Sequence, residues 1–97
     1  MQKQPCVYLL ASRYQGTLYL GVTSDLVKRI WEHKNNIVEG FSKQYDTHYL
    51  VWYETHPTME SAIDREKAIK GWKRDWKLNL IEEKNPLWRD LYHEIIE

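Results

Sequence analysis

Residues 6–34 read CVYLLASRYQGTLYLGVTSDLVKRIWEHK, and this stretch decides the fold. Its first part, 6–12, is an apolar and aromatic run with the length of a buried strand, and 17–23 is a second strand candidate. The residues RYQG between them predict a hairpin loop. After residue 23 the apolar spacing changes to that of a helix, which we expect to continue to about Asn36. The stretch therefore predicts two antiparallel strands followed by an amphipathic helix.

The middle of the chain predicts a loop, a third strand and a second helix. Residues 36–47 are mostly polar and indicate a loop, whereas residues 48–55 are rich in aromatic and β-branched residues and indicate a strand. Pro57 and Thr58 then begin a helix, which Gly71 ends or kinks.

The last quarter predicts two further helices. Residues 73–84 form one of them, and Asn85 with Pro86 supplies the cap and first turn of the other. The apolar stripe of this last helix consists of Leu87, Trp88, Leu91, Tyr92, Ile95 and Ile96. The element order is then β-β-α-β-α-α-α. It indicates an α+β fold, with a small three-stranded antiparallel sheet flanked by helices.

Length and composition favour one soluble domain spanning residues 1–97. A chain of 97 residues can hold a core without disulfides or metals. Cys6 is the one cysteine, so no internal disulfide can form, which fits a reducing compartment. The apolar run around Cys6 is too short for a membrane span and lacks the cleavage region of a signal peptide. We therefore expect a cytoplasmic protein with no membrane partner.

The charges cancel overall but alternate in blocks. Basic residues exceed acidic ones by three in 1–34 and again in 64–77, while acidic residues exceed basic ones by three in 35–63 and in 82–97. If the basic blocks fold together, a positive face can bind phosphates despite the neutral total. Charge alone favours the simpler interpretation of a mixed, solvated surface.

The first helix directs polar side chains toward its apolar face. Leu26, Ile30 and Ile37 form the stripe, and Arg29 and His33 lie on or beside it at helical spacing. A buried arginine needs a partner. Taken singly, Arg29 fits an edge position that reaches solvent, and His33 fits a structural histidine.

The second helix repeats this feature with a carboxylate. Its apolar face consists of Met59, Ala62, Ile63 and Ile69, and Glu66 lies among them. Glu66 can pair with Arg29, which would be a structural role. It can instead bind a divalent cation at the rim of a cleft, because Mg²⁺ keeps several waters and needs few protein carboxylates.

The hairpin supplies two tyrosines and a glycine. Tyr8 lies on the strand face opposite Val7, and Tyr19 lies opposite Leu18. If the residue numbers of paired positions add to an odd total, both tyrosines lie on the same face. Gly21 would leave room for a close approach to the backbone.

In their order and spacing these residues resemble the GIY-YIG nuclease superfamily. Val7-Tyr8 and Tyr19-Leu20-Gly21 stand where the family has its two named motifs, Arg29 and His33 follow on the next helix, and Glu66 resembles the metal-binding Glu. Asn85 resembles the late Asn of the family, and Cys6 replaces the first motif Gly. The resemblance covers nearly the whole chain. It is closest to small stand-alone bacterial members, which are related to the N-terminal domain of the C component of excinuclease ABC.

The resemblance implies metal-dependent hydrolysis of phosphodiesters. Glu66 would hold one Mg²⁺ or Mn²⁺ ion, Arg29 would bind the nonbridging oxygens, and Tyr19 would hydrogen-bond the phosphate or the attacking water. Tyr8 would be the general base. Its phenol has an ordinary pKa of about 10, so forming the anion at neutral pH costs roughly 4 kcal/mol. We expect Arg29, the metal ion and His33 to lower that pKa.

The basic blocks supply candidate contacts to a nucleic-acid backbone. These are Lys28, Lys34, Lys43, Lys67, Lys70, Lys73, Arg74 and Lys77. DNA is favoured over RNA, with low intrinsic sequence specificity or targeting by a protein partner, and relatives suggest a role in DNA repair or processing. Trp72 and Trp76 are interpreted as core residues rather than base-stacking residues.

Two alternatives stay open from the sequence. The first is a non-catalytic nucleic-acid-binding module that keeps the nuclease fold. The second is a protein-interaction adaptor, with the acidic C-terminal helix as its surface. The oligomeric state, and the choice between single-stranded, duplex and branched substrates, also stay open.

Overall fold

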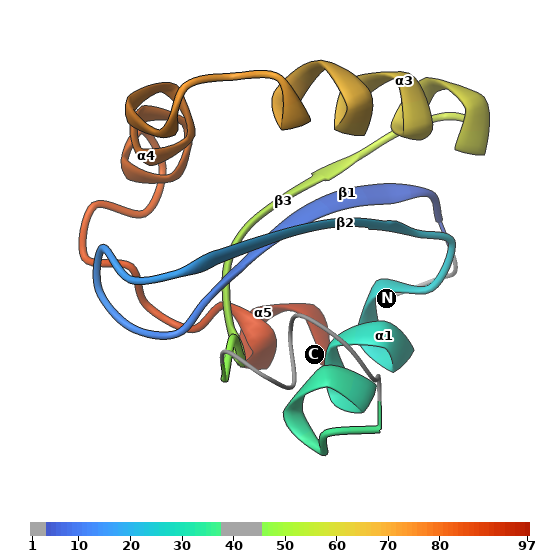
Figure 1. The fold of residues 1–97 in the computed structure, drawn as a ribbon. Coiled ribbons are helices and arrows are strands. Elements are labelled where there is room, and N and C mark those ends of the chain that lie inside the picture. Colours follow the sequence, from blue (N-terminus) through green and yellow to red (C-terminus); the bar gives the residue numbers. More distant parts are fainter. Residues whose placement is uncertain (1–3, 38–45) are drawn as a thin grey trace.

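A computed structural model of the chain describes residues 4–37 and 46–97. Its centre is a three-stranded antiparallel sheet in the order β2-β1-β3. The elements are β1 (Cys6–Ala11), β2 (Leu18–Thr23), α1 (Leu26–Lys34), β3 (Tyr49–Thr55), α3 (Met59–Lys70), α4 (Arg74–Glu82) and α5 (Tyr92–Ile95). Helices α3 and α4 lie on one face of the sheet, and α1 and α5 lie on the other (Figure 1). The expected α+β fold is confirmed. Within these two described segments, no helix has the length and apolar character needed to cross a bilayer.

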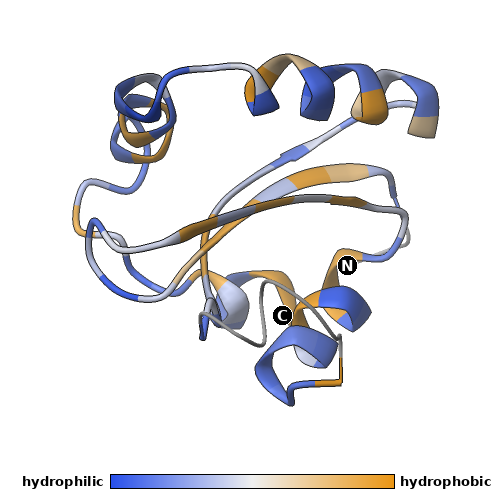
Figure 2. Cartoon of the chain, viewed as in Figure 1, coloured by the Kyte–Doolittle hydropathy of each residue, from blue (hydrophilic) through white to orange (hydrophobic). Residues whose placement is uncertain are grey.

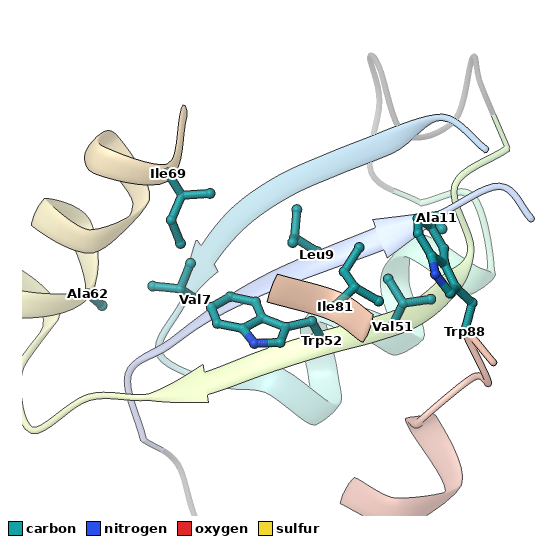
Figure 3. Close-up of a cluster of buried hydrophobic side chains, with 9 residues drawn as sticks. All are labelled: Val7, Leu9, Ala11, Val51, Trp52, Ala62, Ile69, Ile81 and Trp88. Atoms are coloured by element: carbon teal, nitrogen blue, oxygen red, sulfur yellow. The ribbon is translucent and has the colours of Figure 1, made fainter. Parts of the chain in front are cut away.

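The central strand β1 is buried along its whole length because helices cover both faces of the sheet. Its side chains alternate between two hydrophobic clusters. The cluster on the α3 and α4 face, drawn in Figure 3, consists of Val7, Leu9, Ala11, Val51, Trp52, Ala62, Ile69, Ile81 and Trp88. The cluster on the α1 and α5 face consists of Cys6, Tyr8, Leu10, Leu26, Ile30, Leu50 and Ile95. Hydrophobic residues run along the strands and intersperse with polar ones in the helices (Figure 2), as amphipathic packing on a sheet requires.

A bulge in β3 changes which residues reach the core. Leu9 pairs with Trp52, but Leu10 pairs with Leu50, so Val51 is an extra residue in the strand. Val51 and Trp52 therefore both lie in the cluster under α3 and α4, although they are adjacent in sequence.

The first helix is shorter than expected. The Asp25 side chain accepts a hydrogen bond from the Lys28 backbone N–H and caps its start, and Asn35 caps its end. Asn36 has a φ of 56°, which takes the chain out of the helical path. Ile37 is therefore 54% exposed, and its predicted place in the apolar stripe is wrong.

The last predicted helix is largely absent. Asn85 caps no helix; the chain instead turns back toward β3, with Trp88 at a φ of 57°, and only the four residues of α5 are helical. Leu87 and Ile96 are 74% and 52% exposed, so the predicted six-residue stripe is wrong. The physical reason is that hydrogen bonds to β3 hold this segment in a non-helical path.

The two tryptophans near the start of α4 differ in environment. Trp72 is half-buried and packs against the cluster under α3. Trp76 is 54% exposed, so the interpretation of Trp76 as a core residue is wrong. It follows Trp72 by four positions, but α4 begins only at Arg74, so the two residues do not share one helical face.

Candidate active site

Two tyrosines of the hairpin and one histidine of α1 form an aromatic cluster. Tyr8 pairs with Gly21 and Leu10 pairs with Tyr19, so the register total is odd and both tyrosines share the face covered by α1. The Tyr8 hydroxyl lies 3.1 Å from Nε2 of His33. The Tyr8 and Tyr19 ring centroids are 6.3 Å apart, and those of Tyr19 and His33 are 5.1 Å apart. Tyr8 and His33 are almost completely buried, while Tyr19 is half-buried at the edge strand.

Gly21 makes room for the Tyr8 ring. A Cβ atom at position 21 would lie 2.4 Å from both Cζ and Oη of Tyr8. The close approach expected at this glycine is therefore made by a side chain of the cluster. Gly21 supports the site by letting the buried phenol lie across the neighbouring strand and reach His33.

Arg29 supplies positive charge beside the cluster. Its guanidinium is half-buried and lies 3.8 Å from the Glu32 carboxylate. Glu32 is not among the residues singled out from the sequence, although its i,i+3 spacing from Arg29 is a signal for such a pair. Arg29 acts to lower the pKa values of both Tyr8 and His33, so it lies near enough to act on both groups.

The pKa of Tyr8 is raised in the folded protein, so the expectation that its surroundings lower it is wrong. Burial raises the Tyr8 pKa well above its ordinary value, and Tyr19 raises it further, while Arg29 acts in the expected direction but less strongly. Burial, followed by the charges of Arg29 and His48, lowers the pKa of His33 to about 4. At neutral pH the cluster therefore pairs a neutral phenol with a neutral imidazole.

Glu66 lines a cleft together with Tyr19 of the aromatic cluster. This cleft, called the β2 cleft below, is lined by Leu18, Tyr19, Leu20, Glu66 and Lys70. Glu66 is half-buried and makes no hydrogen bond or ion pair with the residues that the structure describes. The structural alternative, a pair with Arg29, is not formed, because the ion-pair partner of Arg29 is Glu32.

The donor set of the β2 cleft fits a hard divalent cation. A carboxylate that pairs with none of the described residues, at the wall of an open cleft, is suited to Mg²⁺ or Mn²⁺, whose remaining ligands are water and substrate oxygens. Within residues 4–37 and 46–97 there is no group of three His, Cys, Asp or Glu side chains that could hold a metal. Glu66 would therefore hold an ion together with substrate rather than in a closed protein cage.

The candidate phosphate contacts fall into two groups. Lys28, Lys67, Lys70 and Lys73 are exposed. Lys34 and Arg74 make bonds within the protein: Lys34 pairs with Asp90 and donates to the His48 carbonyl, and Arg74 donates to the Gln15 and Gly16 carbonyls. Arg74 and Lys77 also line a second cleft with Thr17 and Leu18. Lys43 lies outside the described residues.

Asn85 lies away from the cluster, against β3. Its side-chain amide donates to the Val51 and Arg89 carbonyls at 3.1 and 2.9 Å, and its oxygen accepts from the Arg89 N–H. Asn85 is 3% exposed and holds the segment after α4 to the sheet.

Cys6, which replaces the first motif Gly, is fully buried in β1. Its thiol donates to the Gln4 carbonyl, and burial raises the pKa of the thiol. The strand therefore accommodates a side chain at this position within the core.

Comparison with known proteins identifies one family and a set of small relatives. A family model described as the GIY-YIG catalytic domain matches residues 4–79. A UPF0213 protein of Staphylococcus saprophyticus is 35% identical over 77 residues, which is 79% of this chain and 93% of that protein. UPF0213 proteins of Staphylococcus epidermidis and Staphylococcus aureus are 35% and 33% identical, over 70% and 71% of this chain and 83% and 84% of those proteins. No solved structure matches the chain with significance.

Proposed function

The chain belongs to the GIY-YIG catalytic domain family, a family of nucleases, and from that premise we propose that it is a metal-dependent endonuclease that hydrolyses phosphodiester bonds. The observation that carries this proposal is the contact of Tyr8 with His33, 3.1 Å long, in a cluster whose Tyr19 also lines the cleft of Glu66. A proton acceptor, a cation beside it and a free carboxylate are the parts that such hydrolysis needs.

Tyr8 and His33 act together as the base. A lone phenolate would be scarce, because burial raises the Tyr8 pKa. In the proposed step the attacking water gives its proton to the Tyr8 oxygen while the phenol proton passes to Nε2 of His33. The water oxygen bonds to phosphorus, and the bond to the leaving oxygen breaks. His33 is neutral at pH 7 and so can accept this proton, but its pKa of about 4 makes the imidazolium costly to form. The negative charge of a bound phosphate acts to raise that pKa and aids the transfer.

The charged residues act on the phosphate itself. Arg29 binds the nonbridging oxygens, where negative charge grows in the transition state. Tyr19, at the junction of the cluster and the β2 cleft, hydrogen-bonds the phosphate or the water. Glu66 is the residue that would hold a single Mg²⁺ or Mn²⁺ ion, which when bound supplies the charge that polarises the phosphate and stabilises the leaving oxygen.

The proposed substrate is DNA, bound through its backbone. Exposed Lys67, Lys70 and Lys73 follow one another along the end of α3 and the start of α4, and such contacts are sequence-blind and salt-sensitive. Low intrinsic specificity, or targeting by a protein partner, follows from this. We place the activity in the cytoplasm, within one domain spanning 1–97, and in DNA repair or processing.

A cleavage assay tests the proposal. The protein is incubated with end-labelled single-stranded, duplex, flapped and branched DNA and with RNA, each in Mg²⁺, Mn²⁺ or EDTA. Wild type is run beside Glu66→Ala and beside Asp64→Ala, a matched control that removes an exposed carboxylate from the same helix. We expect metal-dependent cutting that is lost in Glu66→Ala and kept in Asp64→Ala.

Two results would contradict this assignment. Cutting that survives Glu66→Ala would remove Glu66 from the metal site. Binding without cutting by wild type, in every metal, would support a non-catalytic nucleic-acid-binding module instead.

A further inference from the structure

Trp76 is an exposed indole at the end of a basic segment of the chain. It is 54% exposed on α4, in a segment, 64–77, where basic residues exceed acidic ones by three. Exposing a large aromatic ring to water forgoes the stabilisation that burial would give. Trp76 belongs neither to the aromatic cluster nor to the two hydrophobic clusters, although Trp72 and Leu80, which line the same cleft, pack against the cluster under α3 and α4.

The Trp76 ring packs against Trp72 in a small cleft. Trp72 and Trp76 are 6.0 Å apart between centroids, at 74°, and together with Asn79, Leu80 and Glu83 they line a cleft. The Arg65 guanidinium packs against Trp72, 5.3 Å from its ring centroid, and Arg65 is itself bonded to Glu54. These contacts restrain the Trp72 ring. The exposed part of the Trp76 ring, in a cleft that Trp72 also lines, can receive a flat ring.

The charges around the cleft indicate what kind of flat ring it receives. Lys73 precedes Trp76 by three residues and Lys77 follows it directly, so two lysines lie close to Trp76 along the chain, together with the carboxylate of Asp75. Glu83 in the cleft wall would repel a phosphate inside the cleft itself. This arrangement suits an uncharged base in the cleft with its phosphates outside, on the lysines.

One shared lining residue links the β2 cleft to a second cleft at the start of α4, the helix that carries Trp76. The β2 cleft shares Leu18 with the cleft of Arg74 and Lys77, and Lys77 is the neighbour of Trp76 in α4. The molecule measures 29 × 28 × 26 Å along its principal axes. At the spacing of about 3.4 Å per phosphate that one strand has in a duplex, about eight nucleotides span the molecule, and an extended unpaired strand needs fewer. A short strand held at Glu66 can therefore reach Trp76.

We propose that Trp76, backed by Trp72, is a stacking subsite for an unpaired base, so that the substrate carries a single-stranded segment beside the bond that is cut. A paired base offers no free face, because its neighbours in the duplex already cover both sides. The inference rests on the proposed nuclease function for its nucleic-acid partner.

Binding measured without metal tests the subsite separately from cleavage. Fluorescence anisotropy in EDTA compares a labelled 12-nucleotide oligothymidylate, the same strand with abasic sites throughout, and a 12-base-pair duplex. The proteins are wild type, Trp76→Ala, Trp76→Phe and the control Trp31→Ala. Trp31 is 49% exposed on α1, on the opposite face of the sheet (Figure 1). Circular dichroism and thermal melting confirm that each variant is folded.

We expect Trp76→Ala to weaken oligothymidylate binding by about 5- to 100-fold, the range for loss of one stacked base. Trp76→Phe should restore most of the affinity, and Trp31→Ala should leave it unchanged. Wild type should bind the abasic strand about as weakly as Trp76→Ala binds oligothymidylate, and duplex binding should not depend on Trp76.

Three results would overturn the inference. The first is equal oligothymidylate affinity in Trp76→Ala and Trp31→Ala. The second is an equal loss for Trp76→Ala on the abasic strand, which would mean that no base is contacted. The third is a dimer in sedimentation that Trp76→Ala abolishes, which would mean that the indole contacts a second copy. A wild type that binds as expected but never cleaves in Mg²⁺ or Mn²⁺ would contradict the nuclease function while supporting the stacking subsite.

Discussion

Gly21→Ala should destabilise the protein by about 2 kcal/mol, because the added methyl group would overlap the Tyr8 ring. The new Cβ would lie 2.4 Å from Cζ and Oη of Tyr8, and Tyr8 is only 2% exposed. Overpacking a core costs typically about 1–3 kcal/mol. The Tyr8 ring is buried against Tyr19 and His33 and has little room to move, which favours the upper end of this range. Replacing a strand glycine returns up to about 1 kcal/mol of chain entropy, which gives the net figure.

The change is measured by thermal and urea unfolding. For a domain of 97 residues, a loss of about 2 kcal/mol lowers the Tm by about 8–16 °C. Cleavage should fall as well, because the displaced phenol loses its contact with His33. Gly71→Ala is the matched control, since its Cβ would come no nearer than 3.6 Å to the Ala68 carbonyl oxygen, an ordinary contact. Its Tm should not fall and should rise by a few degrees, because the same gain in chain entropy is not offset by a clash.

A double mutant separates this clash from a general effect on β2. In a Tyr8→Leu background the ring is gone, so adding Gly21→Ala should cost little or nothing further. The reasoning would be refuted by a Gly21→Ala protein that melts within about 2 °C of wild type, or by an undiminished penalty in the Tyr8→Leu background.

Three other changes test the cluster and its supports. Tyr8→Phe leaves Nε2 of His33 without the Tyr8 hydroxyl, so stability should fall by about 1–2 kcal/mol and single-turnover cleavage by about 10²- to 10⁴-fold; full cleavage would remove Tyr8 from the base. The pKa of His33 is lower in the folded protein, about 4, than in the unfolded chain, so the unfolded chain binds the proton more readily. As pH falls from about 6.5 to 4, the unfolding free energy should drop by up to about 3 kcal/mol in urea titrations, and a His33→Gln protein with the same pH profile would contradict the assignment. Asn85→Ala removes three hydrogen bonds, one buried and two partly buried, and should cost about 3 kcal/mol while leaving the cleavage rate of folded protein unchanged. A normal melting curve with lost cleavage would indicate a role in the chemistry.

Local chain chemistry was enough to predict the hairpin, the three strands and the helix that carries Arg29 and His33. Alternation along each strand determines which side chains share a face, so one condition on the register was enough to put Tyr8 and Tyr19 together. The helical spacing of Arg29 and His33 likewise follows from local geometry alone. These predictions succeeded because strand and helix periods are properties of the chain itself.

Other features depend on contacts between distant segments. The bulge at Val51 exists only in the pairing of β3 with β1, and the non-helical path after Asn85 depends on hydrogen bonds to β3. The exposure of Trp76 depends on where α4 begins and how it packs. The two partners of each contact are far apart in the chain, so the local pattern of apolar residues cannot predict them.

The sequence by itself determined which chemical groups make up the candidate site, while only the tertiary structure decided their protonation states and contacts. These groups are the phenol of Tyr8, the guanidinium of Arg29, the imidazole of His33 and the carboxylate of Glu66, all identified from their order and spacing in the chain. That the phenol is protonated and bonded to a neutral imidazole follows from burial between the sheet and α1. Burial is a property of the packed fold, and it is burial that determines how costly each charge is.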